Sequence, residues 1–180
     1  MSRLLILGAG IAGHTAAMHA RHALPSHHEV VVVSPNSQWN WIPSNIWVGT
    51  GYMKPEQVTF PLAPVYKKLG IPFHQAKAVS LHPEGSADSP HPYVTIEYTD
   101  PDRQGQVADL QYDFLINATG PRLNFGATKG LGPEGNSLSV CTYGHASHTA
   151  DALTRAVDRM KKGDAQTFLV GTGHGNCTCQ

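Results

Sequence analysis

The chain begins with an apolar segment that runs directly into a glycine motif. Four consecutive apolar residues, 4–7, are followed by Gly8–Gly13, which have the pattern Gly-x-Gly-x-x-Gly. Small residues continue at 15–17, where a helix is predicted. A strand, a glycine turn and a helix in this order form the dinucleotide-binding fingerprint, so this part of the chain is restricted to a Rossmann-type unit.

Each part of the motif has its own role. Gly8 permits the tight turn, Gly10 lets the backbone approach a pyrophosphate, and Gly13 lets the helix pack closely on the strand. The N–H groups of Ile11 and Ala12 lie at the positive end of the helix, where they lack intrahelical partners. The motif therefore predicts a pyrophosphate site at residues 8–13.

A second strand-and-glycine pattern lies at the end of the chain. Residues 167–170 are followed by Gly171 and Gly173, but Asn176 occupies the position of the third glycine. We interpret residues 1–164 as an incomplete FAD-binding domain and residues 165–180 as the first strand and glycine loop of a truncated second domain. Because Cys177 and Cys179 follow this loop, the sequence indicates a truncated flavoprotein.

The remaining pattern predicts an α/β fold. The continuous β-branched run at 28–34 is typical of a buried parallel strand. Alternating residues at 93–98, a turn, and a return at 107–112 predict an antiparallel meander. We expect a Rossmann-like doubly wound parallel sheet with this small meander inserted. Helices are predicted at 64–70 and 145–162, the second with one buried stripe formed by Ala146, Ala150, Leu153, Val157 and Met160.

Charge and composition disfavour several classes of protein. Lysine and arginine number 13 and are balanced by 13 aspartates and glutamates, so we expect no nucleic-acid binding. The sequence shows no signal peptide and no apolar run that could span a bilayer. Its 11 histidines have no ligand spacing with the 3 cysteines, so we expect no metal site.

Three further segments are candidates for ligand contact. A Rossmann unit usually ends its second strand with a carboxylate that binds a ribose, but this chain has Ser34-Pro35-Asn36, whose side chains offer only neutral partners. Residues 37–64 hold all three tryptophans and are expected to form a long loop without regular structure, which either walls a flavin ring or packs on the core. Ala118-Thr119-Gly120 follows a strand, and its small residues allow the backbone to approach a cofactor.

From residue 41 onward the chain resembles the sulfide:quinone oxidoreductases, a family of flavoproteins. The resemblance rests on Trp41–Gly49, on Asp113–Leu123, on Val140-Cys141-Thr142 with His145-Ala146, and on the glycine loop with its cysteines. It extends over essentially the whole chain, which matches the N-terminal part of such an enzyme.

The resemblance implies FAD as the cofactor. It places Gly8, Gly10 and Gly13 at the pyrophosphate, and Ser34 and Asn36 beside the adenosine ribose. Near the flavin ring it implies the residues Pro43, Ser44, Asn45 and Cys141, and it implies that Thr119 and Gly120 contact the cofactor. Cys141 corresponds to a cysteine beside the flavin 8-methyl group, which is covalently joined in some members of the family.

The resemblance also implies a reaction and partners. Hydrosulfide attacks a disulfide, which leaves a persulfide on one cysteine and a thiolate on the other, and two electrons then pass through FAD to a quinone. Cys179 is slightly preferred over Cys177 as the redox cysteine. The resemblance implies a peripheral membrane location, with the membrane contact in a C-terminal part that the chain lacks. Assembly into a homo-oligomer is left as an open alternative. The chain is expected to be inactive by itself.

Three alternatives stay open beside this hypothesis. A flavocytochrome-type sulfide dehydrogenase and an NADH:quinone oxidoreductase are related flavin enzymes, although Asn176 and the cysteines count against the second. A non-catalytic FAD-binding module that senses oxidants through Cys177 and Cys179 is the alternative from another class.

Overall fold

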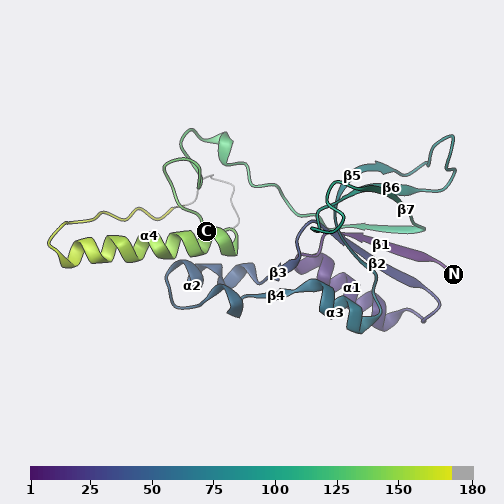
Figure 1. The fold of residues 1–180 in the computed structure, drawn as a ribbon, viewed down its shortest axis with the longest axis horizontal. Helices are drawn as coiled ribbons and strands as arrows, with labels where there is room; N and C mark the ends of the chain where they lie inside the picture. The colour runs from purple at the N-terminus through teal and green to yellow at the C-terminus, as the bar shows by residue number, and fades with distance from the viewer. Residues whose placement is uncertain (172–180) are drawn as a thin grey trace. The chain divides into compact units, whose positions relative to one another are not determined.

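The structure is a computed structural model that describes residues 1–171, and its contacts divide the chain into two compact units. The first unit comprises residues 1–39 and 60–121. The second comprises residues 40–59 and the chain from Arg122 onward. Figure 1 labels the elements of both units.

The first unit contains a six-stranded sheet with the order β7-β6-β5-β2-β1-β8. Strand β1 pairs in parallel with β2 and β8, and β2 pairs in parallel with β5, whereas β6 is antiparallel to both of its neighbours. The strands are β1 (Arg3–Leu7), β2 (Glu29–Ser34), β5 (Phe73–His82), β6 (Tyr93–Tyr98), β7 (Val107–Gln111) and β8 (Phe114–Asn117). The predicted α/β fold, with a mostly parallel sheet and an antiparallel meander, is confirmed.

Two helices cover one face of this sheet (Figure 1). They are α1 (Ile11–Ala23), which directly follows the glycine turn, and α3 (Leu62–Leu69), which ends at Gly70 as the sequence predicts. Ala17 of α1 and Tyr66 of α3 are wholly buried in a cluster with apolar side chains of β1 and β2. The continuous apolar run of β2 thus reflects a strand that is buried on both faces.

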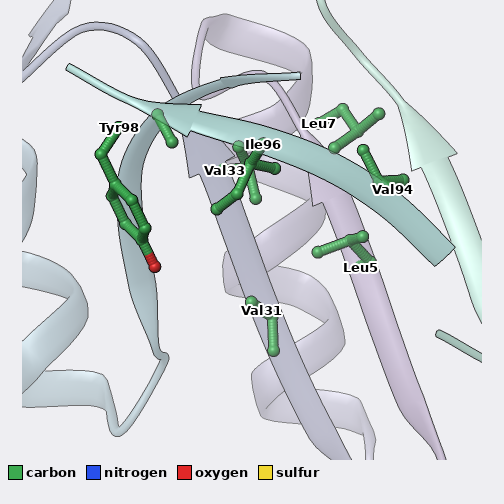
Figure 2. Close-up of a cluster of buried hydrophobic side chains, with 8 residues drawn as sticks. Leu5, Leu7, Val31, Val33, Val94, Ile96 and Tyr98 are labelled. Carbon is green, nitrogen blue, oxygen red and sulfur yellow. The ribbon is translucent and has the colours of Figure 1, made fainter. Parts of the chain in front are cut away.

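The meander covers the other face. Strand β5 pairs with β2 through residues 73–75 and with β6 from Ala76 onward, and its register shifts between Ala78 and Ser80. Figure 2 shows the side chains of β6 lying against those of β1 and β2. The labelled cluster consists of Leu5, Leu7, Val31, Val33, Val94, Ile96 and Tyr98. In the described residues this face is covered by strands and not by a helix.

The second unit is built around α4 (Tyr143–Lys161), which packs on the short helix α2 (Asn45–Gly49). Three 3₁₀ turns accompany them at Ile42–Ser44, Pro55–Gln57 and Phe125–Ala127. Two short strands, β3 (Gln38–Asn40) and β4 (Thr59–Pro61), pair where the chain leaves the first unit and returns to it.

The structure corrects two expectations in the second unit. The segment 37–64 contains short helices and strands, because Val48, Val58 and Ala146 give it a small core of its own. Helix α4 forms where it was predicted, but its apolar stripe is buried only at Ala146. Met160 at the other end is 47% exposed, because no described residue covers the last turns of the helix.

The predicted strand at 167–170 does not form within the described residues, where 164–171 have no helix or strand. Leu169 and Val170 are 96% and 99% exposed, since no described strand pairs with them. The second domain predicted at 165–180 stays a prediction, because most of its residues lie beyond 171.

The cluster in Figure 2 leads to a prediction about stability. Replacing Ile96, whose side chain is wholly buried, with alanine leaves a cavity between β6 and β1. We expect I96A to lower the free energy of unfolding by roughly 2–5 kcal/mol. The control is V107A, because Val107 on the neighbouring strand is 63% exposed and its truncation should change stability by less than about 0.5 kcal/mol. Denaturant unfolding measures both, and equal effects would contradict the packing described here.

Candidate functional site

The glycine turn holds β1, α1 and β8 together through backbone contacts. Gly8 has a φ of 97°, in the left-handed region that favours glycine. A Cβ atom at Gly8 would overlap the carbonyl oxygen of Ala118, and one at Gly13 would overlap the carbonyl oxygen of Gly8. Both glycines are therefore required by the fold, which agrees with the predicted tight turn and close packing.

Gly10 differs from the other two glycines of the motif. A Cβ atom built at Gly10 meets no atom within 4 Å, and the residue is the N-cap of α1 with a φ of −71°. No side chain caps this helix end in the described part of the chain. The N–H groups of Ile11 and Ala12 thus lie at an uncapped helix start beside open space, which is the arrangement that binds a phosphate.

The turn after β2 is held by neighbouring strands. Ser34 is only 3% exposed, and its Oγ accepts a hydrogen bond of 3.4 Å from the N–H of Asn36. The hydroxyl of Thr99 donates to the carbonyl oxygen of Pro35 at 2.9 Å. The side chain of Asn36 is exposed, so it can reach a ligand, whereas Ser34 supports the turn.

Ala118-Thr119-Gly120 is fixed by its own strand end. The N–H of Ala118 donates to the carbonyl of Leu7 at 2.7 Å. Asn117 Oδ1 accepts hydrogen bonds from the hydroxyl and the N–H of Thr119, at 2.8 Å and 3.3 Å. This Asx-type turn leaves Thr119 and Gly120 exposed beyond the end of β8.

These three segments gather at one edge of the sheet. Strands β1, β2 and β8 are neighbours and run in parallel, so the glycine turn, the Ser34–Asn36 turn and the Ala118–Gly120 segment all follow carboxyl ends. In open α/β sheets this edge is where nucleotides bind. The sequence analysis named each of these three segments as a candidate for ligand contact.

Asn45 lies in the second unit and forms a reciprocal pair with Asn40. The Nδ2 of Asn40 donates to Oδ1 of Asn45 at 2.9 Å, and the Nδ2 of Asn45 donates to Oδ1 of Asn40 at 3.0 Å. Asn45 is wholly buried, so its amide fixes the segment instead of pointing to solvent. The role that the structure supports for Asn45 is to position Pro43 and Ser44, which are exposed and partly exposed.

The tryptophans of the segment 37–64 have different surroundings. Trp39 stacks on Phe60 with 4.8 Å between ring centroids and packs against the core of the first unit. Trp41 and Trp47, in the second unit, are 43% and 52% exposed. Trp39 thus packs on the core, as the second of the two alternatives states. Trp41 and Trp47 are exposed, so a ligand could contact their rings.

Cys141 is an exposed thiol immediately before helix α4. Its N–H donates to Oγ of Ser139 at 3.1 Å, and the next residue, Thr142, caps the helix by accepting a hydrogen bond from the N–H of His145. The structure thus places the thiol one residue outside the helix N-cap. It does not test the predicted proximity of Cys141 to a flavin.

His145 is a candidate that sequence reasoning missed. Its Nδ1 is buried and has no hydrogen-bond partner within residues 1–171. The ring contacts the edge of Phe125 at 6.0 Å between centroids and lines a hollow of about 1100 Å³ formed by the loop 122–135. An unpaired buried nitrogen is destabilising, so this atom is a feature that the contacts of residues 1–171 do not account for. The spacing of four residues from Cys141 is the signal that could have found it.

Two predicted site residues, Cys177 and Cys179, lie outside the described residues, as does Asn176. Within residues 1–171, no group of three or more His, Cys, Asp or Glu side chains is arranged to bind a metal ion. No helix in this part of the chain has the length and hydropathy needed to cross a membrane.

The glycine contacts lead to a prediction about folding. G13A places a methyl group on the carbonyl oxygen of Gly8, so we expect the free energy of unfolding to fall by at least about 2 kcal/mol. The matched control is G144A, because a Cβ there meets nothing within 4 Å and alanine favours the helix. Thermal or denaturant unfolding compares them, and an unchanged midpoint for G13A would refute the close contact.

The amide pair leads to a second prediction. N45A leaves the side chain of Asn40 without its reciprocal partner and empties a buried site, so we expect a loss of roughly 1–3 kcal/mol in the free energy of unfolding. N36A is the control, because the Asn36 side chain is exposed. If both variants unfold at the same denaturant concentration, the pair does not stabilise the second unit.

The comparisons with known proteins agree with this geometry. No family model matches the chain. A curated sulfide-quinone reductase of Aquifex aeolicus (strain VF5) is 31% identical over 150 residues, which cover 83% of this chain and 31% of that protein.

Solved structures give the same result. The sulfide:quinone oxidoreductase from the hyperthermophilic bacterium Aquifex aeolicus has a TM-score of 0.73 at 28% identity, covering 88% of this chain and 33% of that one. NDH2 from Plasmodium falciparum, in complex with NADH, has a TM-score of 0.65 at 16% identity over 89% of this chain and 30% of its own, a likeness of fold alone. This chain thus spans about a third of the length of the relatives it matches. The resemblance inferred from the sequence is confirmed: the chain is a sulfide:quinone oxidoreductase-like polypeptide.

Proposed function

We propose that the first unit binds the ADP half of FAD, and that the chain is the nucleotide-binding part of a flavoprotein that oxidises sulfide and reduces a quinone. The observation that carries this proposal is the glycine turn at the uncapped start of α1, in a chain that is 31% identical to a sulfide-quinone reductase. The likeness to NDH2 supports the fold and not the substrate.

The residues of the turn fit a pyrophosphate. Gly10 leaves open space where a side chain would otherwise stand, and the N–H groups of Ile11 and Ala12 would donate to the phosphate oxygens. The exposed amide of Asn36 is placed to bind the ribose as a neutral partner. Thr119 and Gly120 follow the next parallel strand and would contact the cofactor beside the phosphates.

In the second unit, the flavin ring is assigned Pro43, Ser44 and Cys141 as neighbours. The pair of Asn40 and Asn45 supports this assignment, because it fixes the backbone that carries Pro43 and Ser44. Whether a thioether joins Cys141 to the cofactor is a separate question, which mass spectrometry of the flavin-loaded protein answers.

In this proposal, the oxidation of sulfide takes place at cysteine thiols. Hydrosulfide attacks one sulfur of a disulfide, the S–S bond breaks, and the products are a persulfide on one cysteine and a thiolate on its partner. Cys179 or Cys177 supplies one of these sulfurs. Bound FAD would take up the two electrons of each turnover and pass them to a quinone. The membrane contact and the quinone site belong to this proposal for the whole enzyme.

Replacement of Gly10 separates binding from folding. In G10A the methyl group occupies the open space of the phosphate site, so we expect the Kd for FAD to rise at least about tenfold, which corresponds to ~1.4 kcal/mol. Stability should change by no more than about 1 kcal/mol, because the added Cβ meets no protein atom within 4 Å. Quenching of flavin fluorescence measures the Kd, and G144A is again the control. Unchanged FAD affinity in G10A would show that the cofactor does not bind at this turn.

The choice of electron donor tests the reaction. Sulfide added without oxygen to the flavin-loaded full-length protein should bleach the visible absorption of the flavin, and NADH should not. Loss of the colour with NADH alone would favour the NADH:quinone alternative. If neither donor reduces a bound flavin, the oxidant-sensing module is favoured. The 180-residue chain by itself should bind FAD but not turn over sulfide.

A further inference from the structure

A histidine in the glycine-motif helix connects the phosphate-binding turn to the aromatic residues beside it. His14 is the fourth residue of α1, and its N–H donates to the carbonyl of Gly10 at 2.9 Å. Its ring contacts three aromatic rings, with centroid distances of 5.8 Å, 5.6 Å and 5.5 Å to Trp39, Phe60 and Tyr66. His14 thus lies in the first turn of α1, and its ring packs against side chains of β3, β4 and α3.

The hydroxyl of Tyr66 pairs with the imidazole ring of His14. Tyr66 is wholly buried, and in the described residues its hydroxyl has one hydrogen-bond partner, Nδ1 of His14 at 3.0 Å. A buried O–H group needs an acceptor, and Nδ1 of an imidazole accepts only when it carries no proton. A protonated Nδ1 can only donate to the hydroxyl oxygen of Tyr66, and the hydroxyl hydrogen is then left without an acceptor among the described residues.

No described charge compensates a protonated His14. Burial lowers the pKa of His14 below its ordinary value of 6.5, and burial raises the pKa of Tyr66 to about 12. The elements packed against the ring present Trp39 from β3, Phe60 from β4 and Tyr66 from α3. Tyr66 is the ionisable group among these three, and it stays neutral at ordinary pH.

We propose that neutral His14 is a positioning residue for the nucleotide site: its hydrogen bond to Tyr66 holds the first turn of α1, and protonation of His14 loosens that turn and weakens pyrophosphate binding. The proposal rests on the proposed function, because it concerns the affinity of the same turn for FAD. The sign follows from the hydrogen bond. The stabilisation is present above pH 6.5 and is lost as the pH falls through the lowered pKa of folded His14.

The first test measures the Kd for FAD by flavin fluorescence at about pH 7.5 and about pH 4.5, because the lowered pKa of folded His14 moves its protonation below the ordinary histidine range. For the unaltered chain we expect the Kd to rise roughly three- to tenfold at the lower pH. H14N keeps an acceptor oxygen at the position of Nδ1 but does not titrate, so its Kd should change less than about twofold. H19N, which removes an exposed histidine from the same helix, should behave like the unaltered chain.

The second test needs no cofactor. Amide hydrogen exchange at the N–H of His14, corrected for the intrinsic effect of pH, should be faster at the lower pH in the unaltered chain and insensitive to pH in H14N. Y66F keeps the ring but removes the hydroxyl, so exchange should be faster at both pH values. The same exchange and the same FAD affinity at both pH values would overturn the proposal. So would an affinity that rises on acidification, because His14 would then attract the phosphates as a charge.

The two tests separate the two proposals. If FAD binds at neither pH, the proposed function fails, and the exchange of the His14 N–H still decides whether His14 holds the turn. If FAD binds and its Kd follows pH equally in H14N, the nucleotide site stands and the role of His14 is refuted.

Discussion

The close approach of two backbones at the glycine turn is the contact on which the first unit depends. Side-chain atoms at Gly8 or Gly13 would overlap the carbonyl oxygens of Ala118 or Gly8. Because those side chains are absent, β1, its helix α1 and the neighbouring strand β8 meet at one edge of the sheet. The same contact leaves the first N–H groups of α1 uncapped beside open space at Gly10. The packing that closes the fold therefore also creates the uncapped helix start at which we propose that the pyrophosphate binds.

The binding site proposed here uses backbone groups and neutral side chains. Its segments are held by local hydrogen bonds, such as those from Thr99 to Pro35 and from Thr119 to Asn117. A site of this kind depends on the exact placement of its helix, because no charged side chain compensates a shift of the turn. This is why the pairing of His14 with Tyr66, one turn along α1, bears on the affinity for a nucleotide.

In the second unit, a hydrogen-bonded pair of side-chain amides holds the candidate binding residues in place. Asn40 and Asn45 satisfy each other's hydrogen bonds, so a polar pair is buried without an unpaired amide, and the exposed residues around it are held in place. His145 is the opposite case, with a buried nitrogen that lacks a partner in the described residues. The first arrangement supports a rigid segment, and the second leaves one buried polar atom unsatisfied within the described residues.

The sequence by itself determined the first βα unit, the meander, the helix predicted at 145–162 and the three separate candidate segments 8–13, 34–36 and 118–120. It could do so because strand order and glycine spacing are local patterns. Only the tertiary structure decided that Asn45 is buried against Asn40, that the stripe of α4 is covered at Ala146 alone, and that His14 faces Tyr66. His14 and Tyr66 are 52 residues apart, and the cover of α4 depends on which neighbour packs on it. Asn40 and Asn45 are only 5 residues apart, but their pairing depends on the irregular backbone between them. Helical or strand periodicity carries no information about such contacts.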